Sequence, residues 1–304
     1  MTIQILMRKL HGITAILLLF FLLPRINSYS QELTDSTSLW EVETADGNSF
    51  IGTIMDEDSS RLILLTDIYG SIQIPSTQIK TKKVLKQSNL IGGELWFDNP
   101  HATRYFFMTN GYGLRKGEAY YQNTWVLFNQ MSYGITDHIT IGGGVVPLFL
   151  FAGAPTPVWI TPKVAFPIVK EKINMSAGMI LGHVLGEGLS FGIGYGDFSV
   201  GNRDNNLTIG FGWAFADSQW ADSPTLTLSG MTRVGRKTYL LTENYYIGFS
   251  EGSAIGILSA GGRSVQKRLA VDYGLIIPIG ADLGTFLAIP WLGIAIPFGN
   301  KDPE

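Results

Sequence analysis

A strict alternation of bulky apolar side chains with small or polar ones runs through residues 206–216. The odd positions carry leucine, isoleucine, phenylalanine, tryptophan and phenylalanine, and the even positions carry asparagine, threonine, glycine and alanine. Successive side chains of a β-strand point to opposite faces, so this pattern predicts a strand with one apolar face and one small, polar face. A sheet in bulk water normally carries lysine and glutamate on its polar face. The glycine and threonine found here favour a face that lines a closed interior.

Similar alternation returns every ~10–16 residues from about Tyr105 to Phe298, with turn signals in between. In residues 189–198 we expect the bulky set, from Leu189 to Tyr195, to face outward and Gly192, Gly194 and Gly196 to face inward. Counting such segments predicts about twelve strands. Their expected centres are Phe107, Leu127, Gly144, Val164, Gly178, Ile193, Phe211, Leu228, Tyr245, Leu258, Tyr273 and Leu292.

The composition indicates where such strands would lie. The chain has 36 glycines, 12% aromatic residues and only 15% charged residues, against about 25% charged residues in an average soluble domain. A surface in contact with lipid needs few charges, and closed strands satisfy every backbone group in hydrocarbon. We therefore predict an all-β protein in which residues 105–299 form a transmembrane antiparallel β-barrel. The net charge of -3 gives no reason to expect nucleic acid as a partner.

The first residues have the three parts of a signal peptide. Arg8 and Lys9 precede an apolar stretch over residues 13–23, and Ser28-Tyr29-Ser30 stands before Gln31. The apolar stretch is about half as long as the ~20 residues that a spanning helix needs. Residues 1–30 are therefore expected to be removed on export. The chain has no cysteine, so neither a lipid anchor at the cleavage site nor disulfide bonds can form.

Residues 39–86 read as about five short strands separated by turns such as Asp46-Gly47 and Tyr69-Gly70. This pattern resembles the Sm-like, or SH3-like, small barrels. In an exported chain the resemblance implies a binding or spacer module, which we expect in the periplasm, followed by a linker over residues 87–104. Its candidate partners are cell-wall polymer or a periplasmic protein. The basic run Lys80, Lys82, Lys83 and Lys86 could dock on anionic polymer or headgroups, or be a solvated strand end.

Four charged residues fall inside predicted barrel strands: Lys163, Arg233, Glu243 and Asp272. A lysine or arginine that faces lipid at mid-depth costs about 2–4 kcal/mol, so we expect these charges to point inward into the lumen. Arg233 and Glu243 flank a predicted hairpin at residues 235–237 and could pair across it. Such charges form either a structural salt bridge or an ion-selectivity filter.

Motifs for chemistry are absent from the sequence. The clusters Gly142-Gly143-Gly144 and residues 192–196 lie inside alternating strands rather than between a strand and a helix, so they do not predict a nucleotide site. His138-Ile139-Thr140 resembles the His-x-Ser pair of outer-membrane phospholipase, but threonine replaces the serine. The histidines show no metal-ligand spacing. We therefore expect no catalytic residue, no metal site and no cofactor, and predict that the protein is not an enzyme.

Segments spread over most of the mature chain resemble an uncharacterised Bacteroidota-type family of outer-membrane β-barrel proteins: residues 99–105, 116–123, 133–137 and 241–245. The resemblance implies a location in the cell outer membrane, surrounded by outer-membrane lipid, and assigns no activity. Within this interpretation a passive pore for small solutes and a closed structural or binding barrel are both open. The alternative from another class is a soluble secreted β protein that binds a polymer or protein partner.

Overall fold

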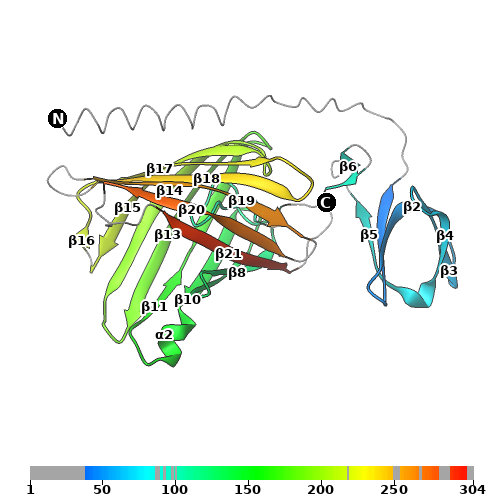
Figure 1. Cartoon of the computed structure of the whole chain (residues 1–304), viewed down its shortest axis with the longest axis horizontal. Helices are drawn as coiled ribbons and strands as arrows, with labels where there is room; N and C mark the ends of the chain where they lie inside the picture. Colours follow the sequence, from blue (N-terminus) through cyan, green and yellow to red (C-terminus); the bar gives the residue numbers. More distant parts are fainter. Residues whose placement is uncertain are drawn as a thin grey trace. The chain divides into compact units, whose positions relative to one another are not determined.

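The computed structural model describes residues 38–85, 90–91, 94–96, 99, 101–217, 219–248, 254–266, 269–280 and 288–299. The expected signal peptide and parts of the expected linker over residues 87–104 lie outside these ranges. The chain divides into two compact units between Lys83 and Val84, which are described separately below (Figure 1).

The first unit is a five-stranded antiparallel sheet with the order β4-β3-β2-β1-β5. Its elements are β1 (Leu39–Thr44), β2 (Ser49–Glu57), β3 (Arg61–Thr66), β4 (Gly70–Pro75), the 3-10 turn η1 (Ser76–Gln78) and β5 (Ile79–Leu85). Val42, Leu62, Leu64 and Ile74 are buried as its core. The short strands expected from the sequence are therefore confirmed.

Two local features shape this first unit. In the β1–β2 turn, Gly47 has a φ of 87°, and the Asn48 amide donates to Asp46 Oδ1 at 3.2 Å. In the basic run, Lys80 Nζ lies 3.1 Å from Glu43 Oε1, and Lys82 Nζ lies 2.6 Å from Glu57 Oε2. These lysines pair with glutamates of their own unit, which fits the interpretation of the run as a solvated strand end.

The second unit contains a closed antiparallel barrel (Figure 1). Its strands are β8 (Ala119–Thr124), β9 (Phe128–Gly134), β10 (Ile139–Val145), β11 (Thr156–Ile160), β12 (Lys163–Val169), β13 (Ile173–Leu185), β14 (Ser190–Gly201), β15 (Asn206–Ala216), β17 (Thr225–Arg233), β18 (Thr238–Gly248), β19 (Ala254–Val265), β20 (Ala270–Ile279) and β21 (Ile289–Phe298). Strands β11 and β12 share one position, since both pair with β10 and β13. Strand β21 pairs with β8 and closes a ring of twelve, which confirms the expected strand number.

Three short strands and one helix complete this unit. Strand β16 (Gln219–Trp220) pairs with the end of β15, and β6 (Leu90–Ile91) pairs with β7 (Glu94–Leu95). The helix α2 (Pro147–Phe151) connects β10 to β11. Among the described residues, no helix has the length and apolar character to cross a bilayer.

Two of the expected strand centres are wrong, and their errors cancel in the count. Phe107 belongs to no strand, because residues 101–118 run through the barrel interior and only an isolated bridge joins Arg104 to Thr109. Leu127 lies in the turn of a hairpin formed by β8 and β9, so one expected strand is two. Trp125 and Val126 in this turn have φ values of 53° and 65°. Asparagine and glycine are the usual residues in that conformation, so these two bulky residues gave no turn signal in the sequence.

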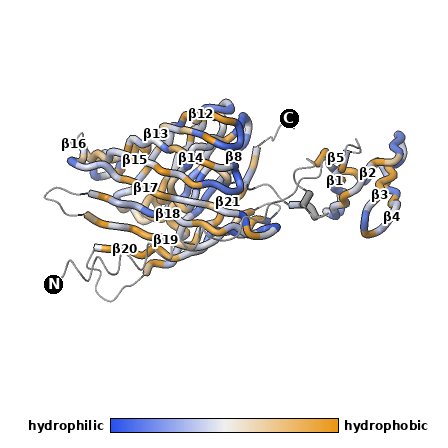
Figure 2. Tube along the Cα trace, turned by 90° about the horizontal axis from the view of Figure 1, so that it is seen from above, coloured by the Kyte–Doolittle hydropathy of each residue, from blue (hydrophilic) through white to orange (hydrophobic). Residues whose placement is uncertain are grey.

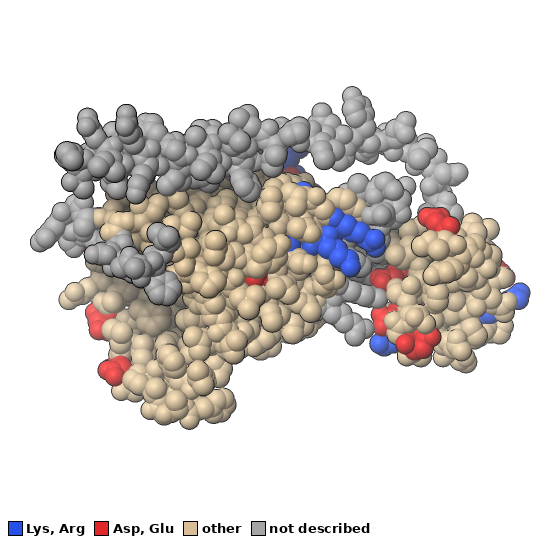
Figure 3. Space-filling model, in the orientation of Figure 1, with Lys and Arg blue, Asp and Glu red and all other residues tan. Residues whose placement is uncertain are grey.

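The face assignment of residues 206–216 is confirmed. Ile209 and Phe211 are 60% and 55% exposed on the outer surface, whereas Thr208 is 1% exposed inside. Figure 2 shows apolar positions recurring along the barrel strands. Figure 3 shows a barrel side nearly free of charge between its ends.

On β14 the expected faces are inverted. Tyr195 is opposite Gly178 on β13 and Gly212 on β15. These two glycines lie on the inner face, with the buried residues Ser176 and Thr208. Tyr195 and the other bulky residues from Phe191 to Tyr195 therefore face the lumen, and Gly192 and Gly196 face outward. The reason is that aromatic rings from a neighbouring strand cover the glycines. A Cβ on Gly192 would meet the Phe215 ring at 2.7 Å, and one on Gly196 would meet the Phe211 ring at 3.3 Å. Packing of a ring over a glycine is a known device for stabilising strands.

We call the end at which β8 begins and β21 ends the termini end, because Ala119 pairs there with Phe298. The turns after β9, β12, β14, β17 and β19 lie at this end, as the antiparallel order requires. Residues 115–118 also lie here, since Gly117 donates to Gly134 O at 2.9 Å and Lys116 N to Asp137 Oδ1 at 2.9 Å. A strand centred at Phe107, as expected from the sequence, would put them at the opposite end.

A closed ladder predicts resistance to detergent. We expect the full-length protein to co-fractionate with outer membranes and, when loaded unboiled, to migrate on a denaturing gel differently from the boiled sample. The physical reason is that no barrel strand has a free edge at which unfolding can begin. Recovery of the mature chain as a soluble monomer without detergent would contradict this expectation.

Candidate functional site: a plug and a cavity inside the barrel

Residues 101–114 lie inside the barrel, and we call this segment the plug. His101, Tyr105 and Asn110 are each 0% exposed. The segment reverses direction in a tight turn, in which the Tyr105 amide donates to Met108 O at 2.9 Å. Because it has almost no regular structure of its own, its backbone groups need partners on the barrel wall.

A buried charge cluster holds the first part of the plug. Arg263 on β19 pairs with Asp272 on β20, with Nε 2.6 Å from Oδ1, and Arg104 Nη2 lies 3.0 Å from Asp272 Oδ2. Arg263 also donates to His101 O at 2.8 Å and to Tyr105 O at 2.7 Å. Arg104 donates to Tyr105 O and Phe106 O, both at 2.7 Å. Two guanidinium groups that fix the plug backbone thus share one carboxylate.

Glu243 on β18 holds the plug turn from another side. Its Oε2 accepts hydrogen bonds from the Phe106 and Phe107 amides at 2.8 and 2.9 Å. On β15, Asn206 Oδ1 accepts a 2.6 Å hydrogen bond from the Tyr105 hydroxyl. Glu243 is 3% exposed, so its charge is bound by backbone amides and is not presented to an open channel.

Lys163 on β12 binds the second part of the plug. Its ammonium donates to Asn110 O and Tyr112 O, both at 2.6 Å. Two strands along the same wall, Asp197 on β14 accepts from Thr109 Oγ1 at 2.8 Å. The plug approaches the wall closely at Gly111, where a Cβ would lie 2.5 Å from Asn174 O.

The termini end has a further contact between the plug and a turn. Tyr112 donates to Gly201 O at 2.5 Å, and the Arg203 guanidinium lies 5.2 Å from the Tyr112 ring and donates to Gly113 O at 2.9 Å. Burial raises the pKa of Tyr112 to about 12, so the phenol stays protonated and remains a donor at neutral pH.

Arg233, the fourth expected lumen charge, lies near the termini end. Its Nη1 is 2.9 Å from Asp204 Oδ2, and its guanidinium lies 5.1 Å from the Tyr239 ring. Arg233 is opposite Tyr239 and Glu243 is opposite Ser229. The pairing of Arg233 with Glu243 considered from the sequence is therefore wrong, because the register sets them four residues apart along β17.

The sequence did not single out Arg104, Asp197 or Arg263. Arg263 and Asp272 are opposite one another on the β19–β20 hairpin, so charge complementarity across that turn was an available signal. Asp197 was hidden by the inverted faces of β14. Arg104 was assigned to the linker, and nothing in its local pattern indicates a segment folded into the barrel.

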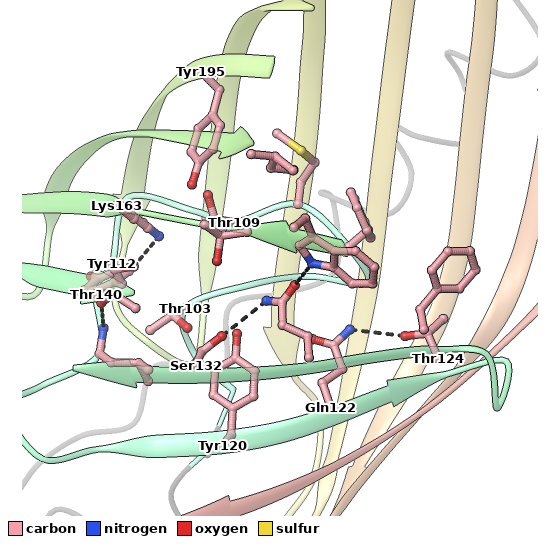
Figure 4. Close-up of a pocket in the computed structure, with 18 of the residues that line it drawn as sticks. Thr103, Thr109, Tyr112, Tyr120, Gln122, Thr124, Ser132, Thr140, Lys163 and Tyr195 are labelled. Carbon is pink, nitrogen blue, oxygen red and sulfur yellow. Dashed lines mark hydrogen bonds between the residues drawn. The ribbon is translucent and has the colours of Figure 1, made fainter. Parts of the chain in front are cut away.

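A cavity of about 280 Å³ lies between the plug and the barrel wall (Figure 4). Four of its aromatic residues are Trp125, Phe128, Trp159 and Trp291. Hydroxyls and Lys163 line it as well. The wall amides are already engaged: Gln130 accepts from Trp159 Nε1 at 2.8 Å, and Gln122 donates to Thr124 Oγ1 at 3.2 Å. Much of the polar wall is therefore paired with itself, and the aromatic rings provide the contact surface.

The histidines take part in packing and hydrogen bonding. His138 lies near a turn at the termini end, with Nδ1 3.0 Å from Ala165 O, and the His101 and Tyr120 ring centroids are 4.8 Å apart. Within the ranges that the structure covers, no group of three or more histidine, aspartate or glutamate side chains could hold a metal ion.

No protein-family model matches the chain, and no curated protein sequence matches it. Solved structures do. The KdgM porin matches with 9% identity over 60% of this chain and 99% of its own, with a TM-score of 0.46. KdgM in complex with disordered oligogalacturonate matches with 8% identity over 60% and 98%, with a TM-score of 0.44. A loop L8 deletion mutant of OmpT, an outer membrane protein of Vibrio cholerae, matches with 12% identity over 86% and 97%, with a TM-score of 0.34. With identities of 8–12% and TM-scores of 0.34–0.46, these matches do not identify the function of this chain.

The charge cluster generates a stability prediction. Asp272→Asn leaves Arg104 and Arg263 buried without their counter-charge, so we expect it to lower the free energy of unfolding by about 3–5 kcal/mol. Denaturant titration of the refolded protein in detergent measures this loss. Asp222→Asn is the control, because Asp222 is exposed and a surface substitution changes stability by no more than ~0.5 kcal/mol. Equal stability of the two variants would contradict the role assigned to the cluster.

Proposed function

We propose that this protein is an outer-membrane β-barrel that its own plug keeps closed, and that it acts as a structural or binding barrel and not as a passive pore. The observation that carries the proposal is the set of hydrogen bonds from Lys163, Glu243 and Arg263 to the plug backbone. Charged groups that could have lined a channel are used to hold a segment inside it.

The membrane location is supported by the barrel's outer surface. Ile209, Phe211 and Trp213 are 60%, 55% and 40% exposed, so they are not packed against another sheet as a soluble sandwich would require. A barrel with such a surface and a closed hydrogen-bond ladder suits hydrocarbon. The signal-peptide pattern of residues 1–30 adds a route of export. Together these observations favour the outer membrane over the soluble secreted alternative.

The closed state is supported by how completely the plug is bound. Twelve strands enclose a lumen between the filled interior of eight-stranded barrels and the water-filled channel of porins. Here the plug occupies that intermediate space and donates to or accepts from β12, β14, β15, β18 and β19. An ion crossing the barrel would have to displace this segment.

We also propose that residues 39–86 form an Sm-like module in the periplasm that binds cell-wall polymer or a periplasmic protein. The sheet order and the 3-10 turn before the last strand support the first part of this proposal. The chain reaches the barrel at the termini end, where the connecting turns are short, and short turns face the periplasm in bacterial barrels.

The plug predicts the electrical behaviour of the barrel. In planar bilayers we expect the wild-type protein to insert without conducting. A variant in which residues 101–114 are replaced by a glycine-serine segment of equal length should conduct, because the lumen then fills with water.

Unboiled gel migration shows that each preparation is a folded barrel, and protein with residues 41–54 replaced in the same way is the matched control for the substitution itself. Stepwise open-channel currents from the wild type would reject the closed barrel and favour the passive pore.

The location of the first unit predicts its protease sensitivity. A protease added to intact cells should spare residues 39–86 and should cleave this unit only after the outer membrane is permeabilised. An epitope inserted after Asp46, in the exposed β1–β2 turn, reports its integrity on an immunoblot. Cleavage in intact cells would mean that the termini end faces the outside.

A further inference from the structure

We propose that the cavity beside the plug binds a long-chain fatty acid, with the carboxylate at Lys163 and the alkyl chain along the aromatic residues. The proposal deepens the binding role proposed above and depends on the barrel being a binding barrel. It rests on the position of one buried cation, on a row of aromatic rings and on the apolar hairpin beside the cavity.

Lys163 is a buried cation without an ion-pair partner among the described residues. It is 5% exposed, lines the cavity and donates only to the carbonyl oxygens of Asn110 and Tyr112. In the structure as described, Asp197 lies beyond ion-pair distance and accepts from Thr109 and Ser176 instead. Buried charges are normally paired, and an ammonium has three donors, of which two are used here. A ligand carboxylate would supply both a negative charge in direct contact with the ammonium and the third acceptor.

The aromatic residues form a continuous row that suits an alkyl chain. The Trp291 and Trp125 ring centroids are 4.9 Å apart, those of Trp125 and Phe128 are 6.2 Å apart, and those of Phe128 and Trp159 are 6.3 Å apart. Trp159 and Trp125 direct their Nε1 groups to Gln130 and to Pro290 O. With these donors engaged, the rings present apolar surface rather than hydrogen-bond donors to a ligand.

Beside this row the barrel strands are short and the connections between them are apolar. Strand β8 has 6 residues and β13 has 13, which correspond to about 20 and 43 Å along the strand. The turn after β8 exposes Val126 to 81%, and α2 exposes Leu148 and Phe151 to 58% and 86%. Side chains of this kind are stable in hydrocarbon rather than in water. This part of the rim therefore offers a path from the outer leaflet into the cavity.

The alternatives fit less well. A sugar would need several free polar groups, whereas Gln122 and Gln130 are bound to neighbouring side chains. The cavity of about 280 Å³ lies at the small end of ligand pockets, which hold roughly 300–1,000 Å³. It can take one alkyl chain but not the several chains of a membrane lipid. A single-chain amphiphile with an anionic head meets each of these conditions.

The test uses quenching of tryptophan fluorescence by a brominated octadecanoic acid and by its methyl ester, with the purified full-length protein in non-ionic detergent. Trp125, Trp159 and Trp291 line the cavity, so a bound bromoalkyl chain quenches them. We expect the acid to bind at least about tenfold more tightly than the ester, because only the acid can pair with a desolvated ammonium.

One variant locates the head group. Lys163→Met should reduce the preference for the acid to within about twofold. Lys172→Met, in an exposed turn, is the charge-matched control and should bind as the wild type does. Unboiled gel migration identifies variants that have folded.

The wild-type comparison decides the proposal even if Lys163→Met does not fold. Equal binding of acid and ester, or no quenching by either, would overturn it. A wild-type protein that conducts in bilayers would instead reject the closed barrel. The two failures are therefore distinguishable.

Discussion

The structure depends on one requirement, which is that an irregular segment inside a membrane barrel must have every backbone group satisfied. The plug has no helix or sheet of its own to do this. Its carbonyl groups accept from Arg104, Lys163 and Arg263, and its amides donate to Glu243. These charges would be costly in a dry interior without such partners. A dry barrel interior and the folded plug are therefore stable only together.

The same requirement explains the cavity. Where the plug lies against β12, β15, β18 and β19, hydrogen bonds fix it to the wall. On the side of β8 and β9 the wall residues Gln122 and Gln130 bind other wall groups instead. Space is left between the two surfaces, and aromatic rings line it. The cavity is thus a consequence of how the polar groups are distributed around the lumen.

The sequence predicts which face of a strand a side chain takes only where the alternation of bulky and small residues along that strand determines it. On β15 the alternation is regular, and the faces of Thr208 and Ile209 followed from it. On β14 the alternation of glycine with bulky residues is equally regular, but here the glycines face outward and the bulky residues face the lumen. The cause is that rings from β15 cover Gly192 and Gly196. The inward position of Lys163 follows from the cost of a charge in lipid. Its contact with Asn110 does not, because that contact joins residues 53 positions apart and depends on a segment that no periodic pattern identifies.

The buried charges indicate that the plug both closes the lumen and keeps it free of water. Among the described residues of the barrel and the plug, six charged residues are buried: Arg104, Lys163, Asp197, Glu243, Arg263 and Asp272. Three are basic and three acidic, so their formal charges cancel. One of them, Arg104, belongs to the plug. Without the plug the wall keeps two basic and three acidic groups, and it also loses the backbone partners of Lys163, Glu243 and Arg263. Such an interior would have to be hydrated. The plug therefore closes the lumen by completing its charge and hydrogen-bond balance as well as by filling its volume.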